Sequence, residues 1–315
     1  MAQTAPPSPN PHSAEAFAQG AASEQERPNR DRLKRAALRE GVSVSVLSVP
    51  ALLLVFFGLI LPCGWLLLLS FVGADGSLSW ENYQRMIDSP SYYRIFVTTF
   101  QISLLTTLIC VALGYPLAYV ITLLPKSLVA LALLAVLLPF WTSMLVRTYA
   151  WLVILQNNGV INSMLIRNGI IDAPIALVHN FTGTLIGTAH IMLPFLVLPL
   201  YNAMRSIDRG LILAAANLGA SPTVRFWTVY FPLTLPGLIA GALLVFVLSL
   251  GFYITPAILG GGRVIMAAMR IQSSVALYAN WGAASAIAAV LLLATIVFLL
   301  ISLWLSRHVF GSRGR

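Results

Sequence analysis

Six long apolar segments, separated by polar stretches, dominate the pattern of this chain. Each is close to the length of about 20 residues with which an α-helix crosses the hydrocarbon core of a membrane. The runs are continuous and do not alternate with a period of two, which favours helices over the strands of a barrel. The sequence therefore predicts an all-α, polytopic membrane helix bundle of about six transmembrane helices. They cover about residues 46–71, 98–121, 128–147, 184–204, 237–257 and 283–306, and the third runs on into 151–155, which leaves its outer end open.

The composition is that of an integral membrane protein. Hydrophobic residues make up 58% of the chain and charged residues only 9%, whereas soluble domains carry roughly 25% charged residues. We therefore expect a multi-pass membrane protein rather than a soluble domain.

Basic residues indicate which side of the membrane each segment faces, because they are enriched on the cytoplasmic side. With both termini in the cytoplasm, 13 of the 19 basic residues fall on the inner side. This orientation places residues 72–97, 148–183 and 258–282 outside and residues 205–236 inside. Attraction to anionic lipids then explains the net charge of +9. Outside the N-terminal tail the chain has no basic stripe with interleaved aromatic residues, which is the pattern that would indicate nucleic-acid binding.

The two ends of the chain differ from its apolar body. Residues 1–44 are rich in Ala, Pro, Ser, Gln and charge, which is typical of a disordered tail. Within it, residues 30–40 could form a helix along the inner membrane surface, or the basic cluster could act only as a topology anchor. We expect the transmembrane domain at 45–310 and a short cytoplasmic tail at 311–315.

The chain carries no catalytic motif that we recognise. It has no GxxxxGK[ST], HExxH or GxSxG motif, and no nucleophile, base and orienting group can be named. Cys63 and Cys110 fall inside apolar segments, where cysteine acts as a small packing residue, and they lack the spacing of a metal or disulfide framework. We therefore expect no catalytic residue, no metal site and no ATP hydrolysis by this chain itself.

A polar island at residues 205–236 separates the fourth and fifth apolar segments. Two short helix-like pieces flank Gly219 and the pair Ser221-Pro222. Alanines before Gly219 keep the first piece slim, and Gly219 can take backbone angles that other residues resist. This pattern predicts a cytoplasmic docking element that protrudes from the bilayer; an ordinary helical hairpin is the alternative.

The island resembles the EAA loop of the permease subunits of bacterial ABC importers, whose pattern contains EAAxxLGAS followed by LP and PG. Two further stretches, residues 138–151 and 157–162, are similar to the spermidine/putrescine branch of these permeases, and the resemblance covers about residues 45–310. The matching residues of the island are Ala214, Ala215, Leu218, Gly219, Ala220, Ser221, Phe226, Pro232, Pro236 and Gly237.

This resemblance implies a transport subunit of the inner membrane that imports a small solute by ATP-driven alternating access. A periplasmic solute-binding protein would deliver the solute to the outer segments 72–97, 148–183 and 258–282. A second, related permease would complete the path, and partner ATPase subunits would bind ATP and Mg²⁺. The residues that would couple this chain to the ATPase are Ala214, Ala215, Leu218, Gly219, Ala220, Ser221 and Arg225.

One residue departs from the family pattern. The Glu of the EAA motif aligns with Leu213. A charged contact to the ATPase is then either absent or supplied by another residue such as Asp208 or Arg225, or the second permease keeps the Glu.

Polar and aromatic residues of the apolar segments are candidates for the translocation path, because buried ionisable groups are often functional and aromatic rings attract cations. Each has a structural alternative. Arg147 can extend its side chain to the membrane interface, a neutral His190 can hydrogen-bond to a neighbouring helix, and aromatic residues at span ends form an interfacial belt. The candidates are Trp141, Arg147, Tyr149, Trp151, His190, Phe252 and Tyr253.

The solute stays open at this stage. The family branch points to a polyamine, yet the six apolar segments contain no acidic residue, and carboxylates are expected along the path of a cation. Either the partner permease supplies them, or the solute is a related amine, an amino-acid-like compound or an organic anion. The alternatives to an importer are a secondary transporter or channel that needs no ATPase, and a membrane scaffold.

Overall fold

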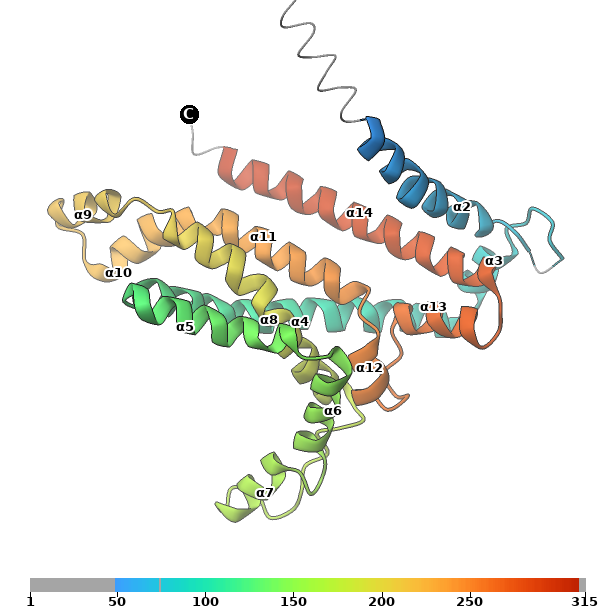
Figure 1. The fold of residues 1–315 in the computed structure, drawn as a ribbon, viewed down its shortest axis with the longest axis horizontal. Coiled ribbons are helices and arrows are strands. Elements are labelled where there is room, and N and C mark those ends of the chain that lie inside the picture. The colour runs from blue at the N-terminus through green and yellow to red at the C-terminus, as the bar shows by residue number, and fades with distance from the viewer. Residues whose placement is uncertain (1–48, 74, 312–315) are drawn as a thin grey trace, which may run out of the picture. The chain divides into compact units, whose positions relative to one another are not determined.

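The computed structural model describes residues 49–73 and 75–311 (Figure 1). The predicted tail at 1–44, with its possible surface helix, and the last four residues lie outside the described part. Helices connected by turns make up the described residues, which contain no strand beyond an isolated bridge between Val72 and Leu78. The prediction of an all-α membrane bundle is therefore confirmed. The chain divides into two units, residues 1–66 and 67–315.

The first unit contributes most of the helix Val49–Leu69, which is long and apolar enough to cross a membrane. Its middle is the π-helix η1, Phe56–Ile60, followed by α2, Leu61–Leu69. The π-turn ends two residues before Pro62, whose ring has no N–H to donate and clashes with the carbonyl four residues earlier. Its large apolar side chains are exposed, as expected for a helix that faces lipid.

The second unit opens with α3, Glu81–Asp88, and α4, Pro90–Leu123. Helix α3 falls within residues 72–97, which the sequence predicts to connect the first two spans. The second span, however, begins eight residues before the predicted residue 98. The polar residues at 90–97 lower the hydrophobicity there, so the start of the helix is not visible in the apolar pattern. Pro90 nevertheless suits the first turn of a helix, and Tyr92 and Ile95 are buried among apolar side chains.

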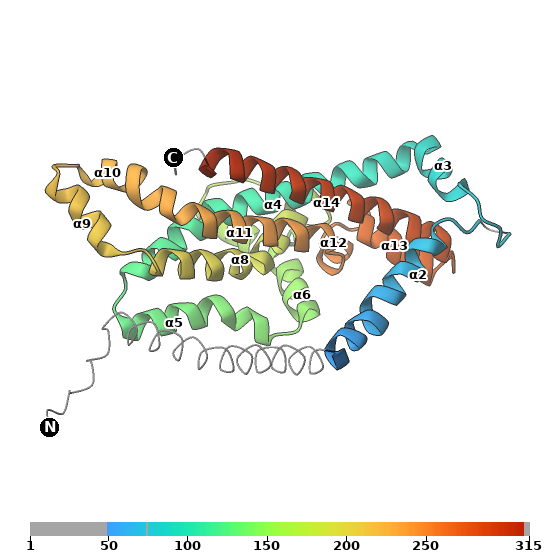
Figure 2. The ribbon, with the colours of Figure 1, turned by 90° about the horizontal axis from the view of Figure 1, so that it is seen from above.

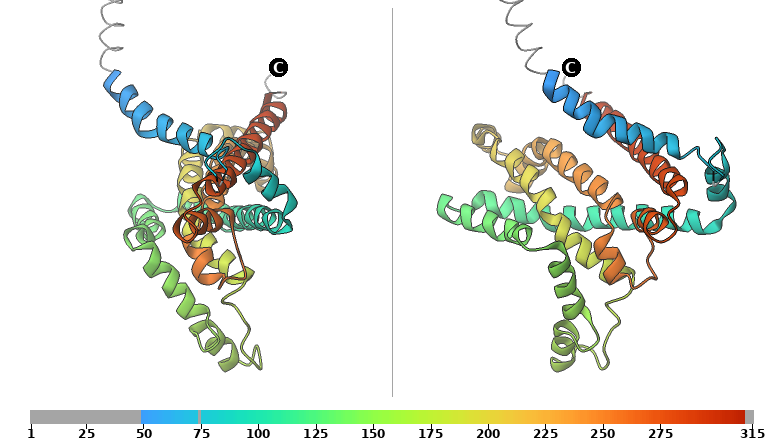
Figure 3. Two further views of the ribbon diagram at one scale, coloured as in Figure 1. Left: turned by 90° about the vertical axis from the view of Figure 1, so that its right-hand side faces the viewer. Right: turned by 45° about the vertical axis from the view of Figure 1, so that its right-hand side comes forward.

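The predicted continuous third span at 128–147 is wrong. The chain forms α5, Lys126–Leu137, then the 3₁₀ turn η2, Leu138–Trp141, and then α6, Met144–Leu155. The axis bends by 98° at this break. Pro139 and the extended backbone of Thr142, followed by the non-helical Ser143, interrupt the helical hydrogen bonds. A further helix, α7, Val160–Arg167, follows, and Figure 3 shows α6 and α7 leaving the direction of α5.

The fourth and sixth spans agree with their predictions, as α8, Phe181–Arg205, and α14, Trp281–Gly311. The predicted fifth span at 237–257 is shifted, because a continuous helical run extends from Pro222 to Leu250. After Gly251 the chain turns into two short helices, α12, Ile254–Leu259, and α13, Ala267–Ala276. Among the described residues, five helices can cross a membrane, or six if the bent pair forms one span.

Helices α4, α8 and α11, Phe231–Leu250, pack against one another as the core of the second unit. The close approach of α8 and α11 depends on a glycine. A Cβ added at Gly237 of α11 would collide with the Cβ of Ala203 of α8. Figures 1 and 2 show the segment between α8 and α11 projecting beyond one end of these helices.

Candidate functional site

The projecting segment consists of α9, Arg209–Asn217, and α10, Pro222–Arg225, which continues into the π-helix η3, Phe226–Tyr230. The carboxylate of Asp208 caps the start of α9 by accepting a hydrogen bond from the Gly210 amide over 2.8 Å. Ser221 caps the next helix at the Val224 amide over 3.4 Å. Both caps satisfy amides that have no partner inside the helix.

Gly219 ends α9 in a left-handed conformation with φ of +82°. Its amide donates to the carbonyl of Ala216 over 2.9 Å, and the amide of Ala220 donates to that of Ala215 over 3.1 Å. This pair of hydrogen bonds is a Schellman motif, which favours glycine because other residues are strained at this φ. The sequence-based prediction of a break at Gly219 is therefore confirmed.

One side of α9 is exposed and mainly apolar, with the exposed Arg209 at its edge. At 100° per residue, its exposed residues form an arc opposite Ile212, Ala215 and Ala216, which are half-buried. Leu213 is 63% exposed and Leu218 is 88% exposed. The exposed arc of α9 consists of Gly210, Leu211, Leu213, Ala214 and Asn217 together with the C-cap residue Leu218.

Of the other predicted coupling residues, Gly219 and Ser221 are exposed, and Ala220 and Arg225 are half-buried. The Nε atom of Arg225 is buried and has no hydrogen-bond partner within the described part of the chain. Arg225 thus packs at the base of the segment and is not presented on the exposed arc of α9.

Three of the predicted path residues come together where α6 meets α8. The indole Nε1 of Trp151 donates to Nδ1 of His190 over 3.1 Å. One helical turn before Trp151, the guanidinium of Arg147 lies 5.8 Å from the ring centre of Phe140. Its Nε is buried without a hydrogen-bond partner among the described residues.

The remaining path candidates are dispersed. Trp141 and Tyr149 are 74% and 56% exposed, and Tyr253 is exposed before α12. Phe252 is buried in the apolar core with Ile191 and Met192. The structure thus groups Arg147, Trp151 and His190 and leaves the other four candidates outside this group.

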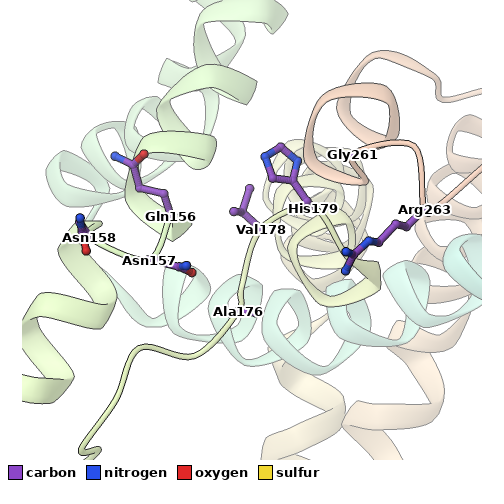
Figure 4. A pocket seen from close by; sticks show the side chains of 8 residues that line it. All are labelled: Gln156, Asn157, Asn158, Ala176, Val178, His179, Gly261 and Arg263. Carbon is purple, nitrogen blue, oxygen red and sulfur yellow. The ribbon is translucent and has the colours of Figure 1, made fainter.

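At the opposite end from α9, an open pocket of about 630 Å³ lies between three loops. Figure 4 shows Gln156, Asn157 and Asn158 on one side and His179 and Arg263 on the other. The sequence places these residues in two separate outer segments, 148–183 and 258–282, and does not predict that they share a pocket. Ala176, Val178 and Gly261 complete its lining.

The pocket is built around a residue in a rare conformation. His179 has φ of +59°, which non-glycine residues seldom adopt. A Cβ at Gly261 would lie 2.5 Å from the Nδ1 of His179, so glycine is required for this close approach. The amide of Asn180 also donates to the carbonyl of Leu259 over 3.2 Å. These contacts hold the start of α8 against the loop after α12.

The predicted outer segment 72–97 is ordered by Asn82. Its side-chain amide donates to the carbonyls of Ser70 and Val72 over 3.2 and 2.9 Å. Nearby, hydrogen bonds from the Ser77 hydroxyl and amide hold the pKa of Asp75 below its usual value. The Asp75 carboxylate is thereby stabilised in its charged form.

Comparison with known families decides the class of the protein. Residues 41–311 match the family model described as "binding-protein-dependent transport system inner membrane component". The chain belongs to this family. It is a multi-pass inner-membrane permease subunit of an ABC importer, so the alternatives of a secondary transporter, channel or scaffold are set aside, and the expectation that it is not an enzyme is confirmed.

The permease is similar to the spermidine/putrescine transport system permease protein PotB of Haemophilus influenzae, with 37% identity over 253 residues, covering 78% of this chain and 88% of that protein. PotB of Escherichia coli K12 is 35% identical over 209 residues, covering 66% of this chain and 76% of that protein. A crystal structure of a bacterial alginate ABC importer has a chain with a TM-score of 0.68 and 18% identity, covering 89% of this chain and 99% of that one. That likeness shows the fold.

Proposed function

We propose that this permease imports a polyamine or a related amine or amino-acid-like compound, as half of a pair with a second permease. In this proposal a periplasmic binding protein delivers the solute, and two ATPase subunits bind the cytoplasmic side. Both termini of the permease lie in the cytoplasm. ATP and Mg²⁺ are held by the ATPase, and this chain needs no cofactor of its own.

The exposed arc of α9 carries the proposed coupling role. Leu213 and Leu218 present apolar surface on a segment that projects beyond the spans. A contiguous apolar surface outside the membrane is unfavourable in water and marks an interaction site. The caps at Asp208 and Ser221 and the turn at Gly219 give this surface a defined shape, as a rigid docking element requires.

The relatives named for spermidine and putrescine support an amine as the solute. The candidate spans of this permease contain no Asp or Glu. Outside the N-terminal tail, all acidic residues lie in the segments that connect the spans. An amine that crosses the membrane here would need its counter-charge from elsewhere. We therefore assign the carboxylates of the path to the second permease.

The outer pocket supports a site for the binding protein. Arg263 is exposed on a wall that faces the amides of Gln156 and Asn157 (Figure 4). Among the described residues, no acidic side chain lines this pocket. A guanidinium beside neutral amides favours a carboxylate, which accepts hydrogen bonds from both. We infer that an acidic side chain of the solute-binding protein enters here.

Purification from the native membrane through a C-terminal tag tests the assembly. We expect mass spectrometry to find an ATPase, a second six-span permease and a solute-binding protein with this chain. The purified complex, placed in liposomes with ATP inside, should then take up labelled spermidine or putrescine when the binding protein is present outside. A complex that repeatedly lacks an ATPase would contradict the assembly, and ATP-dependent uptake that ignores both amines would contradict the solute alone.

A further inference from the structure

We propose that a cluster of aromatic rings at the base of α9 and α10 transmits the movement of the docked ATPase to the transmembrane helices. This inference rests on the proposed docking of an ATPase on α9. We name the cluster the aromatic joint. It consists of Tyr115 and Tyr119 of α4, and of Phe226, Trp227, Tyr230 and Phe231 in and after η3.

Phe226 lies at the centre of the aromatic joint. Its ring meets Tyr119 and Tyr115 edge to face, with centroid distances of 5.8 and 6.3 Å. It stacks on Tyr230 at 5.8 Å, and Tyr230 in turn meets Tyr119 at 5.4 Å. Edge-to-face and stacked pairs have preferred geometries, so these interlocked rings resist sliding of η3 along α4.

A hydrogen bond between side chains also connects α4 to α11 at the aromatic joint. The hydroxyls of Tyr115 and Thr234 are 3.1 Å apart, and the Thr234 hydroxyl donates its proton to the carbonyl of Phe231 over 2.7 Å. Because a hydroxyl has one proton to donate, Tyr115 must be the donor to Thr234. The hydrogen-bond chain therefore runs from α4 through the side chain of Thr234 to the backbone at the start of α11.

The backbone at the joint is also unusual. The amide of Phe231 bonds to the carbonyl of Phe226, five residues earlier, which defines the π-helix η3. The next residue is Pro232, which has no N–H and whose ring would clash with the carbonyl four residues before it. The wider π-turn relieves this clash, and such turns are frequent at functional sites. Helix α9 contacts η3 directly.

The joint is continuous with the rigid core of the bundle. Gly114, next to Tyr115, approaches α8 so closely that a Cβ there would lie 2.6 Å from the Cδ2 of Leu196. Helices α4, α8 and α11 pack along one another. A displacement of α9 therefore reaches η3 by contact, α4 through the rings, and α8 through close packing.

An interfacial aromatic belt is the alternative explanation of these rings. Trp227 is 59% exposed and suits such a belt. The other five rings are half-buried, and each contacts at least one other ring of the joint rather than pointing separately outward. Their arrangement therefore favours a mechanical connection.

Ring removal tests the proposal in the complete purified complex in liposomes. Tyr119→Leu and Phe226→Leu should keep the ATPase bound at wild-type stoichiometry and keep ATP hydrolysis without binding protein. The number of solute molecules taken up per ATP should fall by about 2- to 30-fold, the usual range for residues that carry coupling. Tyr119→Phe, which keeps the ring, should restore the ratio.

Tyr93→Leu is the matched control, because this tyrosine also lies on α4 but is 73% exposed. It should leave uptake per ATP unchanged. An unchanged ratio in both ring variants would overturn the proposal, as would loss of the ATPase from them, since the rings would then shape the docking site instead. If even the wild-type complex contains no ATPase, the proposed function fails before this test begins.

The hydrogen bond provides a second measurement. Tyr115→Phe and Thr234→Val should each lower uptake per ATP, and the double variant should be no worse than Thr234→Val alone. Additive losses would show that the two hydroxyls act separately, and would contradict a connection through this bond.

Discussion

The indole of Trp151 and the imidazole of His190 form a direct hydrogen bond between α6 and α8, with 3.1 Å from Nε1 to Nδ1. An imidazolium has no acceptor nitrogen, so this bond requires the neutral ring with its proton on Nε2. The neutral His190 side chain therefore connects α6, the helix after the bend, to the core helix α8 through this hydrogen bond. This geometry fits the structural alternative for His190 better than a role in the translocation path.

Trp151→Phe removes the donor and keeps an aromatic ring. We expect the free energy of unfolding to fall by about 0.5–1.5 kcal/mol, the net value of a hydrogen bond, measured as a lower thermal midpoint in detergent. Trp141→Phe, at a side chain that is 74% exposed, is the control and should shift the midpoint less. Equal shifts in both variants would contradict this assignment.

Gly219→Val should disturb the docking segment without blocking membrane insertion. No atom of the described residues lies within 4 Å of a Cβ at Gly219, so the penalty comes from its φ of +82°, at roughly 1–2 kcal/mol for an L-residue. Gly219→Asn should be milder, because asparagine tolerates this conformation. ATPase retention on the tagged complex should rank glycine first, asparagine second and valine last; a valine variant that binds as well as wild type would count against the docking role.

Leu213 replaces the acidic residue of the family pattern, so ATPase binding should be apolar in character. We expect the complex to survive 1 M NaCl, because salt screens charge pairs and does not weaken apolar burial. Leu213→Gln should weaken ATPase binding by about tenfold or more, given the value of burying one leucine. Leu277→Gln, at a site 74% exposed near the opposite end, should not. Release of the ATPase by salt alone would contradict the apolar interface.

Arg263→Gln should weaken the binding protein's affinity for the complex by up to about fivefold, as expected for an exposed charge pair. The salt dependence of that affinity should also decrease. Binding can be followed by the stimulation of ATP hydrolysis as the binding protein is titrated. Lys126→Gln, at the end of the bundle near α9, is the control; an equal effect there would indicate a non-specific loss of charge.

Gly237→Ala tests the close packing of α8 and α11. The added methyl group collides with the Cβ of Ala203, and overpacking of this kind typically destabilises by about 1–3 kcal/mol. The exchanged pair, Ala203→Gly with Gly237→Ala, leaves one methyl group at the contact and should recover most of the loss. Thermal unfolding of the wild type and of these two variants measures this, and a Gly237→Ala variant as stable as the wild type would contradict the contact.

The sequence predicts those parts of the fold that depend on local chemistry. The long apolar runs predict the spans. Gly219 and Ser221 predict the turn after α9, because a left-handed glycine and the helix cap that follows it both depend on residues adjacent in the sequence. The break of the third span was missed even though Pro139 lies in it. Hydrophobicity stays high through residues 138–141, so periodicity alone cannot separate a bent span from a straight one.

The candidate sites were less predictable, since they join residues far apart in the chain. Trp151 and His190 were both named, but their hydrogen bond depends on how α6 packs against α8. His179 and Arg263 come from different loops, and the strain at His179 is visible only in its backbone angle. The sequence shows Tyr115 and Tyr119 only as residues of a span, and their contacts with the rings of η3 appear only in the folded structure.

The π-turn at Phe226–Tyr230 makes the number of residues in this segment as important as their kind. A π-turn amounts to one residue inserted into an α-helix. If the π-turn is kept, removing one residue between Ser221 and Pro232 shortens this helical run, and the segment before the deletion rotates by about 100° around the helix axis. Leu213 and its neighbours would then face another direction. Homologues that use the same docking geometry should therefore vary in side chains here while preserving the length of this stretch.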